Sequence, residues 1–124
     1  MKINIFLSFA ISVLLIFSSC SHKPDELDKI EESLSLDPNS GLTALRKLDL
    51  QTLSPSQKAH YAVIFSETYD QQKMHQTAKT DSLLDFAIQH YIKTENSEML
   101  GRAYYSKARK AHKDKQFESA IQLY

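Results

Sequence analysis

The chain is poor in glycine, cysteine and tryptophan, and each shortage excludes a class of site. Its 124 residues include two Gly, one Cys and no Trp. Two glycines supply neither a Gly-x-Gly-x-x-Gly nor a Gly-x-x-x-x-Gly-Lys loop, which excludes the usual phosphate-binding cradles. A single cysteine excludes an internal disulfide and any Cys-x-x-Cys metal or redox site.

The charges of the chain balance. Fifteen Lys and Arg face fifteen Asp and Glu, so the formal net charge is zero. A neutral balance gives no general electrostatic reason to bind nucleic acid, and we expect no such partner. The length suits one small domain.

Residues 1–19 have the composition of a secretory signal peptide. Met1 and Lys2 form a positive start, and a largely apolar run follows from Ile3 to Phe17. As a helix this run would reach about 22 Å, which is short of the roughly 30 Å hydrocarbon core of a bilayer. A cleaved signal is therefore favoured over a membrane-spanning helix.

The run ends in Phe17-Ser18-Ser19-Cys20, which resembles the lipobox of bacterial lipoproteins, although Leu is usual where Phe17 stands. The resemblance implies that Cys20 carries a diacylglycerol on its thiol and an acyl chain on its amine, with 20–24 as a lipidated tether. Such an anchor suffices for stable attachment. Ser21, where Asp would retain a lipoprotein at the inner membrane, favours the outer membrane, on its periplasmic or cell-surface face. An ordinary signal peptide with an accidental Cys is the alternative.

The residues after the tether show helical periodicity. The pattern predicts helices at about 25–36, 40–48, 55–72, 80–93, 97–113 and 116–124. Ser54-Pro55-Ser56-Gln57 is typical of a capping box, and Thr80 and Asn96 are candidate N-caps. Because the links are short, neighbouring helices should be antiparallel, and we expect an all-α fold of three helical hairpins.

Apolar stripes indicate which side chains these helices bury. One stripe lies on the helix at 80–93 and consists of Leu83, Leu84, Ala87, Ile88, Tyr91 and Ile92. Five tyrosines fall on predicted buried stripes: Tyr61, Tyr69, Tyr91, Tyr104 and Tyr124. Tyr105 points away from its stripe and is expected at the surface.

Residues 103–124 resemble a tetratricopeptide repeat (TPR). The positions that match its two helices are Tyr104, Ala108, Phe117, Ala120, Ile121 and Tyr124. Its second-helix pattern also occurs from Leu84, about one repeat length of ~34 residues earlier. Lys115 stands where Gly is usual. The resemblance, to TPR lipoproteins of Gram-negative bacteria, implies that the hairpins of 25–124 stack as a right-handed solenoid.

The sequence stops at Tyr124, inside the last predicted helix. Repeat arrays need closing caps and usually three or more units. We therefore expect that the domain is truncated at its C-terminal end. The alternative is a last helix that frays from a marginal core.

The titratable residues show no catalytic pattern. The five His residues lack His-Glu-x-x-His spacing, and no Gly-x-Ser-x-Gly elbow occurs. His60 and Glu67 could share a helical face, but a surface or groove position explains them without chemistry. We expect no enzymatic activity, no metal site, and no cofactor beyond the lipid on Cys20.

The candidate binding residues lie on the helix expected at 97–113. If the TPR resemblance holds, five of them line the concave groove in which such proteins hold a peptide or a partner's helix: Arg102, Tyr105, Arg109, His112 and Lys113. A basic groove with an aromatic residue would suit an acidic segment or a C-terminal carboxylate. The alternative is a solvated cationic face, or one attracted to anionic headgroups.

Together these features predict a lipid-anchored, TPR-like adaptor or scaffold that binds protein partners at the outer membrane without catalysis. Three alternatives stay open. The first is a glycan-binding outer-membrane lipoprotein, for which the lack of Trp is unfavourable. The others are the N-terminal sensor part of a longer signalling protein and the remnant of a broken gene.

Overall fold

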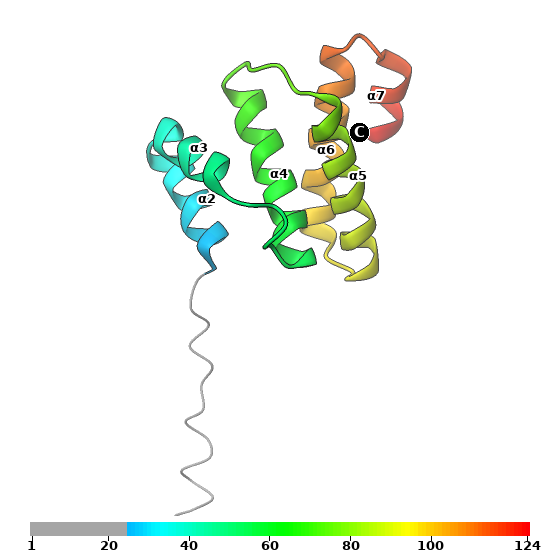
Figure 1. Ribbon diagram of the computed structural model, residues 1–124. Coiled ribbons are helices and arrows are strands. Elements are labelled where there is room, and N and C mark those ends of the chain that lie inside the picture. Colours follow the sequence, from blue (N-terminus) through cyan, green and yellow to red (C-terminus); the bar gives the residue numbers. More distant parts are fainter. Residues whose placement is uncertain (1–24) are drawn as a thin grey trace, which may run out of the picture.

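The computed structural model describes residues 25–124, and the predicted signal peptide, Cys20 and tether lie outside the described residues (Figure 1). Within residues 25–124 it contains six helices and no strand, which confirms the all-α class. The helices are α2 (Glu26–Leu36), α3 (Pro38–Lys47), α4 (Pro55–Gln71), α5 (Ala78–Lys93), α6 (Ser97–Lys113) and α7 (Phe117–Leu123). None of these six is long and apolar enough to cross a membrane.

Two predicted helix starts are confirmed by their caps. At α4, the Ser54 hydroxyl accepts a hydrogen bond from the Gln57 backbone N–H, and the Gln57 side chain accepts one from the Ser54 N–H. This is the reciprocal capping box. At α6, the Asn96 side chain accepts a hydrogen bond from the Met99 N–H.

Two other predicted starts are wrong. Helix α5 begins at Ala78, so Thr80 is not its cap and is instead buried inside the first turn. Helix α3 begins at Pro38, two residues earlier than expected. The Asp37 side chain accepts a hydrogen bond from the Asn39 N–H, and a proline fits the first helical position, where its missing N–H costs nothing. Asp37 and Pro38 thus start the helix.

Two residues beyond the ends of α4, α5 and α6 the backbone is left-handed, at Lys73 (φ 55°), Glu95 (φ 55°) and Lys115 (φ 60°). The following N–H then reaches back to a carbonyl of the last turn, as in the 2.9 Å bond from Gln116 N to Ala111 O. This is the Schellman motif, in which the left-handed position is usually occupied by glycine because glycine has no Cβ. The chain therefore makes three sharp helix ends without glycine.

The helices pack in consecutive pairs, α2 on α3, α4 on α5, and α6 on α7. Helix α5 also packs on α6, and α4 contacts α2, α3 and α6. Helices α2, α4 and α6 thus follow one another as a row with α4 at its centre (Figure 1). This row forms the face described in the next subsection.

One apolar cluster joins the first five of these helices: Leu27, Ile30, Leu45, Ala59, Tyr61, Ala62, Val63, Ile64, Leu83, Ala87, Ile88, Tyr91 and Ala103. The predicted stripe on α5 is buried except for Ile92, which is 47% exposed. The expectation that Tyr124 is buried is wrong, since it is 65% exposed. In the described part of the chain α7 packs on α6 alone, which also leaves Phe117 and Ile121 largely exposed.

The two glycines give a matched pair of stability predictions. A Cβ at Gly41 would lie 2.6 Å from Leu34 Cγ and 2.8 Å from the Leu34 backbone N, where α3 meets α2. Gly41→Ala should therefore lower the free energy of unfolding by about 1–3 kcal/mol through overpacking. A Cβ at Gly101 in α6 meets nothing within 4 Å, so Gly101→Ala should raise that free energy by about 0.5–1 kcal/mol. Urea unfolding followed by circular dichroism measures both, and effects of the same sign would contradict this packing.

Candidate functional site

Two adjoining hollows follow the row of α2, α4 and α6. The first, of about 380 Å³, lies between α2 and α4 and reaches Arg102 of α6. The second, of about 400 Å³, lies between α4 and α6 and is lined by Tyr105 and Arg109, among others. Glu67 and Gln71 line both hollows, which therefore adjoin each other and are here together named the α2/α4/α6 groove.

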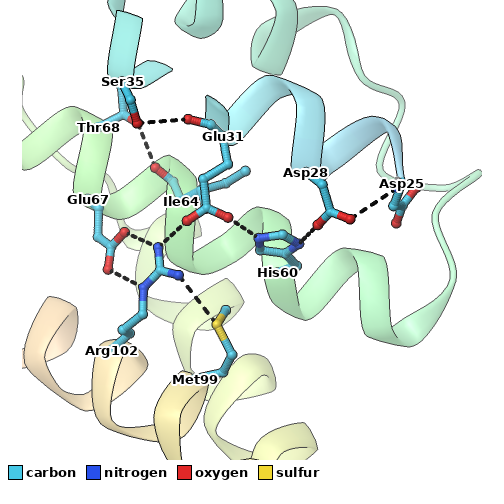
Figure 2. A network of polar contacts seen from close by, with 10 residues as sticks. All are labelled: Asp25, Asp28, Glu31, Ser35, His60, Ile64, Glu67, Thr68, Met99 and Arg102. Carbon is cyan, nitrogen blue, oxygen red and sulfur yellow. Dashed lines mark hydrogen bonds and ion pairs between the residues drawn. The ribbon is translucent and has the colours of Figure 1, made fainter. Parts of the chain in front are cut away.

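Arg102 connects the three helices across this groove (Figure 2). Its Nε donates to Glu67 Oε1 at 3.0 Å, and its Nη2 donates to Glu67 Oε2 and to Glu31 Oε1, both at 2.6 Å. The three side chains are between 27% and 34% exposed, so water screens these ion pairs less than pairs on the open surface. The hydrogen bond with Glu67 raises the pKa of Arg102, and a second bond to Glu31 adds to this against the opposing effect of burial.

Glu31 is also in contact with His60 of α4. His60 Nε2 lies 2.7 Å from Glu31 Oε2, and His60 Nδ1 lies 3.9 Å from Asp28 Oδ1 (Figure 2). Burial raises the pKa of the Glu31 carboxyl, but the hydrogen bonds with His60 and Arg102 outweigh it, and the pKa is lowered overall. Glu31 is therefore a carboxylate at neutral pH, fixed by one group from α4 and one from α6.

At the α6 end of the groove, a single carboxylate holds two cations. Arg109 Nε and Nη2 lie 3.0 and 2.9 Å from Asp70 Oδ2, and Lys113 Nζ lies 2.5 Å from Asp70 Oδ1. Burial raises the pKa of Asp70, but its bonds with Lys113 and Arg109 outweigh it and lower the pKa. Asp70 is only 16% exposed, whereas Arg109 and Lys113 are 44% and 38% exposed. The two cations therefore still face solvent.

The structure places the five predicted groove residues differently. Arg102, Tyr105 and Arg109 line the groove, and Lys113 borders it through Asp70. His112 is exposed, and its ring lies edge-on to Phe117 of α7 with 5.5 Å between the ring centroids. Four of the five are thus brought together along one groove, while His112 points toward the last helix.

Three acids pair with the groove cations, Glu31, Glu67 and Asp70. None of these pairs was predicted from the sequence, and only Glu67 was named there, as a residue that could share a face with His60. All three come from helices other than α6, so no spacing within one helix indicates the pairing. The available signal was that Glu67, Asp70 and His60 recur at intervals that place them on one face of α4. With these acids present, the groove alternates in charge and is not simply basic.

Chemically, the groove offers fixed charges and hydrogen-bonding groups. Within residues 25–124 no group of three or more His, Cys, Asp or Glu is placed to hold a metal ion. The carboxylates of Glu31, Glu67 and Asp70 already contact cations of the chain. Such an arrangement suits recognition of a polar, extended surface.

The lowered pKa values predict a loss of stability in acid. Glu31 and Asp70 have pKa values below the ordinary 4.5 and 3.8 when folded, so the unfolded chain binds protons more readily. The stability they provide is complete above those ordinary values and disappears as pH falls through the lower folded-state values. Glu31→Gln should remove its share of this pH dependence, about 1 kcal/mol.

The measurement is urea unfolding of the full chain in detergent across the acidic range. Glu32→Gln is the matched control, because Glu32 is the exposed neighbour of Glu31 on α2. If the unfolding free energy of Glu31→Gln depends on pH as steeply as that of the Glu32→Gln control, the assigned ion pairs are contradicted.

Comparison with known proteins provides no further evidence on the function of this groove. No family model, no curated protein and no solved structure matches the chain.

Proposed function

We propose that this protein is a lipid-anchored helical adaptor that binds a protein or peptide partner in the α2/α4/α6 groove, without catalysis. The observation that carries the proposal is the pair of adjoining hollows whose charged side chains are held by ion pairs between three helices. Groups fixed in this way lose little freedom when a partner binds, which favours recognition. A concave helical surface suits an extended segment or a helix of the partner.

We further propose that the three hairpins form a TPR-like right-handed solenoid. Support comes from the TPR-like residues 103–124 and from the row of α2, α4 and α6, against which α3, α5 and α7 pack. The left-handed conformation of Lys115 is also compatible, because it stands where the repeat usually has glycine. In such a solenoid the α2/α4/α6 groove would be the concave surface.

The proposed anchor is the lipid on Cys20, and the proposed location is the outer membrane, on its periplasmic or surface face. Support comes from the lipobox-like Phe17-Ser18-Ser19-Cys20 and from Ser21 after it. The five residues 20–24 span at most about 18 Å when extended. The groove would therefore bind its partner close to the bilayer.

A protein partner is favoured over a glycan. Sugar rings stack best on flat aromatic platforms, and the exposed ring that lines the groove is that of Tyr105, which packs against the ring of Tyr124. Their planes meet at 64° with 5.8 Å between centroids, so they form an edge-to-face pair. This pair presents no flat platform.

The anchor is tested by the intact mass of the membrane-extracted protein. We expect the mass of a chain that begins at Cys20 plus two or three acyl chains, and a Cys20→Ser variant that lacks those chains and leaves the membrane fraction. A native chain that carries no lipid and partitions into the soluble fraction would refute the anchor.

The adaptor role is tested by site-specific photo-crosslinking in cells. A photo-reactive phenylalanine analogue at Tyr105, which is 54% exposed in the groove, should yield a discrete protein adduct. Phe86 on α5, 36% exposed and outside the groove, is the matched control position and should yield none. Adding Arg109→Glu should weaken the adduct at Tyr105. Equal adducts at the two positions, or none at Tyr105, would argue against partner binding in the groove.

A further inference from the structure

The ratio of cations to carboxylates is opposite at the two ends of the groove. At the α2 end, the two carboxylates of Glu31 and Glu67 share the single guanidinium of Arg102, so two negative charges and one positive charge leave −1. At the α6 end, the single carboxylate of Asp70 is shared by Arg109 and Lys113, so this cluster carries +1; Glu67, which also borders this hollow, is bonded to Arg102 and is counted with the first cluster. The groove is therefore bipolar.

The excess negative charge at the α2 end does not depend on the protonation of its histidine. His60 lies between Glu31 and Asp28, and Asp28 adds one more carboxylate to the same group. With His60 neutral the group carries −2, and with His60 protonated it carries −1. In both states this end attracts a cation.

The excess positive charge at the α6 end stands on the rim of the groove. Arg109 directs both Nε and Nη2 to the same oxygen of Asp70, and the described residues offer no acceptor to its Nη1. With 44% and 38% of their side-chain surfaces exposed, Arg109 and Lys113 can bind a further carboxylate without leaving Asp70. Such charge-assisted bonds are the strong ones in recognition.

We propose that the groove binds an extended segment of a partner protein that carries opposite charges in a fixed order. A Lys or Arg side chain lies in the hollow beside Glu31 and Glu67. An Asp or Glu side chain lies beside Arg109 and Lys113. This inference depends on the proposed adaptor function and defines the chemistry of its partner.

Repulsion gives this groove its selectivity. A uniformly acidic segment would place carboxylates against Glu31 and Glu67, whose one counter-ion is already engaged by both. A uniformly basic segment would meet Arg109 and Lys113. Like charges in a partly desolvated hollow are costly, and such unfavourable contacts exclude wrong partners. Glu67 and Gln71, which line both hollows, lie where the two ends of the groove meet.

The test is selection from a displayed library of random peptides against the full chain in lipid nanodiscs. We expect enriched peptides that share one basic and one acidic residue in constant order and spacing. Replacing the acidic residue of the consensus peptide by its amide should weaken binding roughly tenfold. Amidating the C-terminus of that peptide should leave binding unchanged, which separates a side-chain carboxylate from a terminal one.

Variants of the chain assign each charge to its end of the groove. Peptides selected for binding to the Arg109→Glu variant should lack the conserved acidic residue and keep the basic one. Peptides selected for binding to the Glu31→Gln variant should keep the acidic residue and no longer require the basic one. Lys79→Glu, at an exposed position of α5 outside the groove, should change neither. Arg109→Gln repeats the first test with a smaller change, and circular dichroism verifies that every variant folds.

The outcomes separate the two proposals. Enrichment of uniformly acidic peptides, or a required free C-terminus, would overturn the bipolar ligand and leave the adaptor function in place. If no enriched peptide responded to Arg109→Glu or Glu31→Gln, the groove would not be the binding surface, and both proposals would be overturned.

Discussion

The geometry of the groove depends on the Arg102 guanidinium, which is bonded to α2 and α4 at once. The pair α2–α3 packs on the remaining helices through α4, so the ion pair with Glu31 is its polar link to α6. Without the guanidinium, the carboxylates of Glu31 and Glu67 would face each other in a hollow that water only partly reaches. Unpaired charge in such a place is strongly unfavourable, and α2 would shift to relieve it.

The same pairing explains how the groove can be both rigid and selective. Each cation that lines it is fixed by a carboxylate of another helix, so the charges would be in place before the proposed partner binds. Because the ratio is two carboxylates to one cation at Arg102 and the reverse at Asp70, fixing the side chains does not neutralise the groove. A lipid on Cys20 would keep this surface near the membrane.

Local chemistry made most of the helices predictable, whereas the candidate site was only half predictable. The capping box at Ser54 and the cap at Asn96 can each be recognised from a few consecutive residues, and the structure confirms both. The helix expected from about residue 40 begins at Pro38, because Asp37 caps it and a proline fits its first position. The pairing of Glu31 with Arg102 joins positions 71 residues apart and follows only from the packing of α2 against α4 and α6. For the same reason the cations of α6 were identified and their partners were not.

A double-mutant cycle on Glu31 and Arg102 tests the central claim most directly. Unfolding free energies would be measured for the full chain, for Glu31→Gln, for Arg102→Met and for the double variant. If Arg102 holds α2 against α6, the two substitutions should be coupled by about 1–2 kcal/mol, with the double variant losing less than the sum of the single ones. Additive losses, with a coupling within about 0.3 kcal/mol of zero, would show that the groove does not depend on this ion pair.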